Sequence, residues 1–201
     1  MTELTVLTVG HSNHSIEKLL SLLEANGVTA IGDVRSSPYS RYISHFNREP
    51  LQQTLKDHRI AYVFLGVELG ARSKDPACYE RGKVQYSRLA ETDLFQAGLR
   101  RVVQGAASHR LALLCAEKEP LDCHRTILVA RELEKQGLRV SHIHSDGHLE
   151  PHGDAIKRLF KTLDLPETDL FRTPKDLVAQ AYALQAERIA HVSEDAGDGS
   201  G

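Results

Sequence analysis

The sequence predicts an α/β fold in which helices cover a mostly parallel sheet of about five strands. Short apolar runs recur along the first part of the chain, and between them apolar residues repeat at helical spacing. Neighbouring parallel strands need crossover connections, and helices usually provide them. After about His144 only the helical pattern continues, so we expect the chain to end in a helical appendage.

Strands and helices are expected to alternate along the chain. Strands are expected at 4–9, 28–34, 61–65, 110–115 and 139–143. Helices are expected at 16–23, around Leu51 and Leu55, and at 86–105, 126–136, 155–163 and 177–192, with Gly137 as a cap and Thr173-Pro174 as a start. The domain organisation predicted is an α/β domain at 1–150, a helical C-terminal appendage at 151–192 and a disordered tail at 193–201.

Composition narrows the class of protein. The 201 residues are 41% hydrophobic, which is enough for one core. The net charge of −2 gives no general basic field, so nucleic acid is a possible partner that the net charge does not support. No stretch approaches the roughly 18 apolar residues of a membrane span, and three cysteines do not suggest a disulfide framework. We therefore expect a cytoplasmic protein with no membrane contact.

Polar residues follow every predicted strand. In open parallel sheets, ligands bind beyond the carboxyl ends of the strands, so we expect these residues to meet. They are His11 and Ser12 after the first strand, Asp33, Arg35 and Ser36 after the second, Glu68 and Arg72 after the third, Cys115 and Glu117 after the fourth, and His144 after the fifth.

Four arginines are expected at this edge of the sheet: Arg35, Arg41, Arg72 and Arg125. The planar guanidinium group suits a phosphate or a carboxylate, so a small anionic or phosphate-bearing ligand is one hypothesis. The alternative is that each arginine pairs with a nearby acidic residue. Asp33, two residues before Arg35 on the same strand face, is a candidate for such a pair and equally for a catalytic acid or base.

The segment from Cys115 to Arg125 links the most apolar strand to the start of a helix. Backbone N–H groups at a helix start favour an anion or a thiolate. Cys115 is therefore a candidate nucleophile and His124 a candidate proton carrier. A small buried core residue is the alternative for Cys115.

The same segment offers ligands for a metal ion. Cys115, Cys123 and His124 suit zinc, but seven residues separate the cysteines, whereas structural zinc sites place two to four between them. The sequence names no cofactor, and metal binding stays an alternative. A fourth ligand would have to come from a distant histidine, of which the candidates are His11, His144 and His148.

Three motifs, in order, closely resemble the DUF488 family (domain of unknown function 488). They are Gly10-His11-Ser12-Asn13-His14-Ser15, then Asp33-Val34-Arg35-Ser36 with Pro38, Ser40, Arg41 and Phe46-Asn47, then Cys115-Ala116-Glu117-Lys118 with Cys123-His124-Arg125. The resemblance runs from about Val6 to about His144 and implies a Rossmann-like three-layer domain, but no reaction. The site positions that it carries over are His11, Ser12, Asp33, Arg35, Ser36, Pro38, Arg41, Asn47, Cys115, Glu117, Cys123, His124 and Arg125.

Three function hypotheses follow. The first is an enzyme or enzyme-like domain that binds a phosphate-bearing small molecule, a nucleotide or a nucleic-acid end, with Asp33, Cys115 or His124 as reactive groups. The second is a non-catalytic module that recognises a nucleotide or nucleic acid. The third, from a weaker likeness, is a rhodanese-like sulfurtransferase with a persulfide on Cys115. Acidic residues and a proline between Cys115 and Cys123 argue against the glycine-rich anion cradle that this third hypothesis needs.

Overall fold

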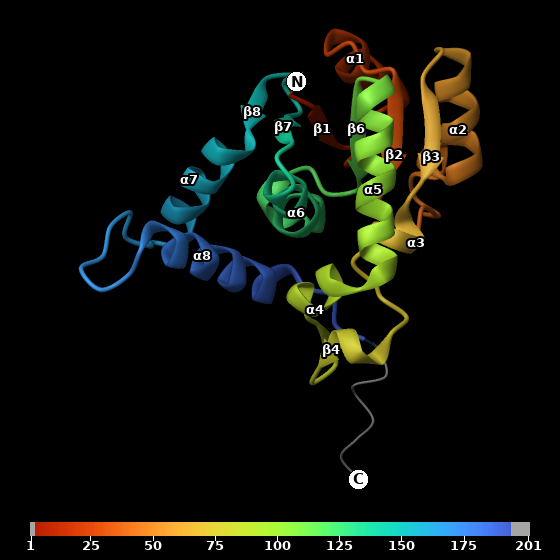
Figure 1. Cartoon of the computed structure of the whole chain (residues 1–201). Coiled ribbons are helices and arrows are strands. Elements are labelled where there is room, and N and C mark those ends of the chain that lie inside the picture. Colours follow the sequence, from red (N-terminus) through yellow and green to blue (C-terminus); the bar gives the residue numbers. More distant parts are fainter. Residues whose placement is uncertain (1–2, 194–201) are drawn as a thin grey trace.

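A six-stranded sheet forms the centre of the protein, with the strand order β3-β2-β6-β1-β7-β8 (Figure 1). The structure is a computed structural model that describes residues 3–193. Five strands are parallel, and β8 runs antiparallel to β7. The strands are β1 (Thr5–Gly10), β2 (Ala30–Asp33), β3 (Ala61–Phe64), β6 (Leu111–Cys115), β7 (Arg139–Ile143) and β8 (Leu149–Pro151).

Helices cover both faces of the sheet and complete three layers. On one face lie α1 (Ile16–Ala25) and α2 (Arg48–Asp57), and on the other α5 (Asp93–Ser108) and α6 (Arg131–Lys135) (Figure 1). Because successive strand side chains point to opposite faces, each strand supplies both layers of the core. The predicted mostly parallel α/β fold is confirmed. Two further helices, α7 (His152–Thr162) and α8 (Pro174–Ile189), follow the sheet.

The order of the strands creates a crevice at their carboxyl ends. From β1 the chain passes to β2 and β3 over the α1 and α2 face, then returns to β6 and β7 over the α5 and α6 face. The chain therefore leaves β2 and its neighbour β6 toward opposite faces. Such a switch point is where open α/β sheets bind ligands.

Short elements lie between the main strands and helices, and two of them differ from what the sequence predicted. The expected continuous helix at 126–136 begins as a π-helix over Arg125–Ala130 before α6. The expectation of helices alone beyond His144 is wrong, because β8 pairs with β7 there. A strand of three residues is too short to show alternation. The remaining elements are 3-10 helices at Ser44–Phe46, Pro76–Cys78 and Pro120–Asp122, with α3 (Gly66–Leu69), β4 (Tyr79–Glu80), β5 (Lys83–Val84) and α4 (Tyr86–Glu91).

The end of α8 returns to the hairpin of β4 and β5 (Figure 1). The amide of Val84 donates to the carbonyl of His191 at 3.0 Å, and the amide of Ser193 donates to the carbonyl of Gly82 at 2.7 Å. The other residues of the predicted tail, 194–201, lie outside the described residues. Among the described residues, no helix has the length and apolar character needed to span a membrane.

Candidate functional site

A pocket of about 270 Å³ lies at the carboxyl ends of β2 and β6, at the switch point of the sheet. Arg35 and Ser36 after β2 line it, as does the loop that runs from Cys115 to His124 after β6. Ile189 and the residues near it close the pocket from the end of α8. The predicted location of a ligand site at this edge therefore coincides with a pocket.

Two thiols and an imidazole meet at the wall of this pocket. Cys115 ends β6, Cys123 follows the 3-10 helix of the loop, and His124 precedes the π-helix. The Nδ1 atom of His124 lies 3.7 Å from Sγ of Cys115 and 3.9 Å from Sγ of Cys123. All three side chains are buried, with exposed fractions of 8% or less. We call these three residues the thiol–imidazole cluster.

A backbone contact fixes the orientation of the His124 ring. Its Nε2 atom lies 3.1 Å from the carbonyl oxygen of Val34, which only accepts hydrogen bonds, so Nε2 carries the proton. In the neutral ring, the lone pair of Nδ1 then faces the two sulfur atoms. A ring held in this way presents one defined nitrogen to its ligand or proton donor.

Glu117 adds a carboxylate to the cluster. Both thiols donate to its Oε2 atom at 3.1 Å. The residue is exposed at the pocket wall, although this oxygen faces the buried sulfur atoms. Burial and the neighbouring Cys123 raise the pKa of Glu117. The group is thus suited to exchanging protons with the thiols or with a ligand in the pocket.

The two cysteines have different acidities. Hydrogen bonding to Cys123, together with burial, raises the pKa of Cys115. Burial by itself would raise the pKa of Cys123, but hydrogen bonding to Cys115 and the charge of Arg125 outweigh it and lower that pKa. The two thiols interact, so the first proton lost belongs to the pair, whereas the sequence singled out Cys115.

Arg125 holds the loop that carries Glu117. Its side chain is fully buried and donates from Nη1 to the carbonyl of Glu117 at 2.7 Å and from Nη2 to that of Lys118 at 3.3 Å. Gly10 at the end of β1 lies beneath the same loop, where a Cβ atom would come within 1.8 Å of the Glu117 carbonyl oxygen. Arg125 therefore acts through the loop and does not line the pocket.

The chain matches the family described as "Domain of unknown function DUF488" over residues 15–131. It belongs to the DUF488 family. The match covers more than half of the chain and includes the whole thiol–imidazole cluster, Glu117 and Arg125, whereas the motif from Gly10 to His14 precedes it. Comparison with curated proteins and with solved structures gave no match.

In this DUF488 protein, Asp33 and Arg35 form a buried ion pair. Asp33 Oδ1 accepts from the backbone amide of Arg35 at 3.1 Å and from its Nε at 2.9 Å, and Oδ2 accepts from Nη2 at 2.6 Å. Arg35 Nη1 donates to the carbonyl of Phe46 at 2.8 Å. Both side chains are almost fully buried, so most donors of this arginine are used inside the protein. The structure thus contains the Asp33–Arg35 ion pair that was one of the two roles considered for Asp33 from the sequence.

Tyr62 completes the shell around Asp33 by donating its hydroxyl to Oδ2 at 2.7 Å. We expect Tyr62→Phe to lower the free energy of unfolding by about 1.5–3 kcal/mol, because one hydrogen bond to a charged group is lost while the ring is kept. Urea denaturation of the two proteins measures this difference. An unchanged midpoint would show that the hydroxyl contributes nothing to the stability of the pair.

His11 packs behind the same ion pair. Its Nε2 lies 3.2 Å from Nη1 of Arg35, its Nδ1 lies 2.8 Å from the carbonyl of Ser12, and its ring stacks on Phe46. Burial and the charge of Arg35 lower the pKa of His11 to about 4. The imidazole is therefore neutral at pH 7 and serves as an acceptor for Arg35.

The remaining predicted residues divide between the pocket and the surrounding loops. Ser36 and Arg72 line the pocket, and the Ser36 hydroxyl accepts from the amide of Arg72 at 3.1 Å. Arg41 is exposed and outside the pocket, and Asn47 accepts from the amide of Ser40. The four predicted arginines do not converge. Ser12 likewise lies outside the pocket, with its hydroxyl on Asn13.

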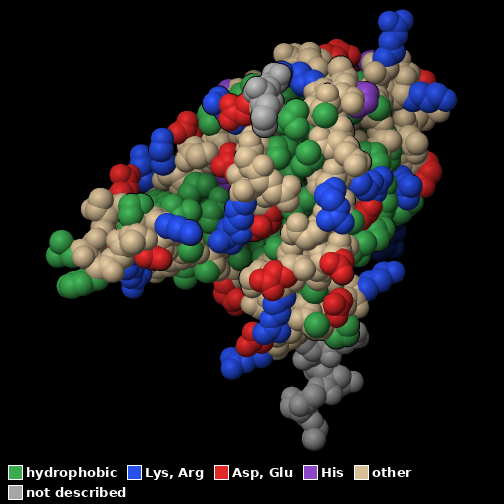
Figure 2. All heavy atoms as spheres, in the orientation of Figure 1, with side chains coloured by type: hydrophobic (Ala, Val, Ile, Leu, Met, Phe, Trp, Pro, Cys, Tyr) green, Lys and Arg blue, Asp and Glu red, His purple; other side chains and the backbone are tan. Residues whose placement is uncertain are grey.

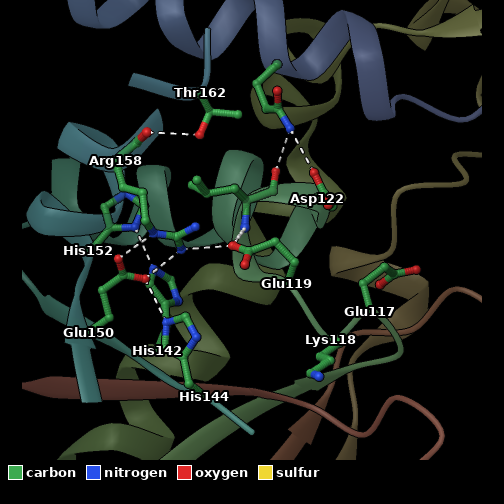
Figure 3. A network of polar contacts seen from close by, with 12 residues as sticks. Glu117, Lys118, Glu119, Asp122, His142, His144, Glu150, His152, Arg158 and Thr162 are labelled. Atoms are coloured by element: carbon green, nitrogen blue, oxygen red, sulfur yellow. Dashed lines mark hydrogen bonds and ion pairs between the residues drawn. The ribbon is translucent and has the colours of Figure 1, made fainter. Parts of the chain in front are cut away.

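The histidines considered as a fourth metal ligand lie elsewhere. His144 contacts Glu150 at 2.8 Å, and Figure 3 shows it in a separate polar network with Glu150, Arg158 and Glu119. Arg158 contacts both glutamates at 2.8 Å and so braces the far end of the loop that carries the cluster.

The sequence does not indicate that some of the pocket residues lie near the site. Tyr86, Asp122, Ile189 and His191 all line the pocket, yet none directly follows a strand of the sheet. Tyr86 begins α4, and the last two lie at the end of α8. The packing of α8 against the rest of the chain brings Ile189 and His191 here, whereas Asp122 belongs to the loop after β6.

Proposed function

We propose that this DUF488 protein is an enzyme whose reaction centre is the thiol–imidazole cluster with Glu117. One observation carries the proposal: two thiols, an imidazole nitrogen and a carboxylate contact one another at the wall of a pocket. Buried groups with a purely structural role are normally paired with backbone or with inert partners. Here the reactive atoms are paired with each other and lie beside space for a ligand.

The placement of the arginines favours an enzyme over an anion-binding module. Arg35 donates to Asp33 and Phe46, and Arg125 donates to the carbonyls of Glu117 and Lys118. Arg72 is the remaining predicted arginine at the pocket. Figure 2 shows basic and acidic side chains interspersed over one face of the molecule, without a continuous basic stripe. A clamp for phosphate or nucleic acid would need several free guanidinium groups on one side.

The loop after β6 supports neither a rhodanese-type cradle nor a persulfide on Cys115. In such a cradle successive backbone N–H groups point at the bound anion. Here the amide of Leu121 donates to the side chain of Glu119, and those of Asp122 and Cys123 donate to the carbonyls of Glu119 and Pro120. These donors are used within the loop.

The ligand is expected to be a small polar molecule. The pocket volume of about 270 Å³ lies at the small end of ligand pockets. Its lining includes both acidic groups, Glu117 and Asp122, and basic ones, Arg72 and His124. Such a mixed lining suits a molecule with donors and acceptors more than one with a multiple negative charge. Glu117 is placed to move a proton to or from it.

A metabolite-consumption experiment tests the proposal. Purified protein is incubated with a mixture of small polar metabolites, and mass spectrometry identifies the compounds that are converted. We expect conversion by the wild type and by C78A, and a loss of at least about 100-fold in C123S and E117Q. Cys78 is the matched control because it is equally buried but does not line the pocket. Equal conversion by C123S, or none by the wild type, would contradict the proposed reaction centre.

A further inference from the structure

We infer that the thiol–imidazole cluster is a zinc site with three protein ligands and a fourth position open to the pocket. The ligand atoms are Sγ of Cys115, Sγ of Cys123 and Nδ1 of His124, which lie within 4.8 Å of one another. The inference rests on the proposed function, since it assigns a reaction class to the same pocket. It adds a metal ion and the activation of water to that proposal.

The spacing of the ligand atoms fits tetrahedral zinc. With Zn–S bonds of about 2.3 Å and Zn–N bonds of about 2.0 Å, tetrahedral angles place sulfur and nitrogen about 3.6 Å apart. The two sulfur-to-Nδ1 distances are 3.7 and 3.9 Å. Both exceed the tetrahedral value by only a few tenths of an ångström, and the two sulfur atoms lie within 4.8 Å of each other, so a zinc ion fits among the three atoms after a small adjustment.

The surroundings provide the support that zinc ligands usually have. The Nε2–H group of His124 donates to the carbonyl of Val34, which leaves Nδ1 as the coordinating nitrogen. Zinc binding replaces the two thiol protons. Arg125 is buried beside the cluster and Glu117 contacts both sulfur atoms. With both thiolates, Zn²⁺, Arg125 and Glu117 charged, the site has no net charge, which limits the cost of burying it.

The number of ligands points to a catalytic and not a structural ion. Structural zinc sites are closed by four protein ligands, whereas catalytic sites use three and leave one position for water or substrate. Among the described residues, the three members of the cluster form the one compact group of metal-ligating side chains. All three line the pocket, so the fourth position faces it. The long separation of Cys115 from Cys123 arises because one ligand ends β6 and two precede the π-helix.

Glu117 supplies the proton transfers that a hydrolytic reaction needs. When the thiols ionise, Glu117 loses both of its hydrogen-bond donors and is free to accept from water at the fourth position. In hydrolysis the water oxygen bonds to an electrophilic carbon, and one water proton passes to Glu117. Glu117 then returns this proton to the oxygen or nitrogen whose bond to that carbon breaks. The substrate class is therefore a small polar molecule with a hydrolysable C–O or C–N bond.

Metal analysis of the reconstituted chain tests the zinc site. The wild type and variants are unfolded in denaturant that contains a chelator and are then refolded with ZnCl₂. After excess metal is removed, plasma mass spectrometry measures the zinc content of each protein. We expect about one zinc per chain in the wild type, C78A and E117Q, and less than about 0.1 in C115S, C123S and H124A. Circular dichroism of each variant shows whether it has folded. With CoCl₂ instead, the wild type should show visible tetrahedral cobalt absorption and thiolate charge transfer, and E117Q should show the same.

The outcomes separate the zinc site from the proposed function. A folded wild type without zinc or cobalt overturns the zinc inference, while loss of metabolite conversion in C123S still upholds a thiol-dependent enzyme. Stoichiometric zinc without any conversion upholds the metal site and overturns the proposed enzyme. Loss of zinc in E117Q would make Glu117 the fourth ligand, close the site and overturn the hydrolytic assignment.

Discussion

Asp33→Ala is expected to lower the free energy of unfolding by about 3–5 kcal/mol. The substitution leaves the guanidinium of Arg35 buried without its carboxylate, and an uncompensated buried charge is among the costliest defects in a core. Guanidinium chloride unfolding at pH 7 measures the change. Asp146→Ala is the matched control, because Asp146 is exposed, and it should change stability by less than about 0.5 kcal/mol.

The double variant D33A, R35M sharpens this prediction. If the cost comes from the unpaired charge, removing Arg35 as well should recover part of the stability. A buried ion pair adds little net stability, so the loss of both charges costs less than the loss of one. A single variant D33A as stable as the wild type would show that Arg35 can reach water. The hypothesis of a ligand-binding Arg35 would then regain support, since a mobile guanidinium group could turn into the pocket.

Acid is expected to destabilise the protein well before its carboxylates are protonated. A buried chain of hydrogen bonds joins the sheet to α8: Thr8 contacts His142 at 2.8 Å, His142 contacts His152 at 3.0 Å, and His152 contacts the Tyr182 hydroxyl at 2.7 Å. Burial lowers the pKa of His152 from 6.5 to about 4, and burial together with His152 holds the pKa of His142 well below its usual value.

The direction of the effect follows from proton binding. Between pH 6.5 and pH 4 the unfolded chain binds protons at these histidines and the folded chain does not, so stability falls as the pH falls. For His152 the loss amounts to about 3 kcal/mol by pH 4, and stability is complete above pH 6.5. Urea unfolding at a series of pH values measures it.

A variant without the two histidines isolates their contribution. H142Q, H152Q should be less stable than the wild type at pH 7 but should lose less stability on acidification. His11 titrates in the same range and is present in both proteins, so its contribution cancels in the comparison. Parallel pH profiles for the two proteins would contradict the prediction, as would equal stability of the wild type at pH 7 and pH 5.

The sequence predicted the sheet, and the edge of it where the pocket lies, because these depend on local patterns. Apolar runs marked five of the six strands, and the residues after β2 and β6 proved to line the pocket. The DUF488 motifs contain every member of the thiol–imidazole cluster. The sequence did not predict the three-residue strand β8 or the π-helix. Neither has a periodic pattern long enough to distinguish it from a loop or from an α-helix.

The roles of the charged residues depended on contacts that no local pattern contains. Arg35 and Arg125 are residues of the type that clamps an anion, but in the structure Arg35 donates to the carboxylate of Asp33 and Arg125 to the carbonyl of Glu117. Likewise, the ring orientation of His124 is set by the carbonyl of Val34, which is distant in sequence. Residue type limits the chemistry of a group, whereas its partners decide which part of that chemistry is used.

The return of the chain end to the β4–β5 hairpin has a consequence for synthesis. Ile189 and His191 line a pocket whose other walls are made much earlier in the chain, and the pairing of Val84 with His191 holds them there. During translation, β6 and the loop after it are made before the segment that covers them. The nascent protein therefore passes through a stage in which Cys115 and Cys123 lack this cover, and it lasts until residues 189–191 have been made and have paired with the hairpin.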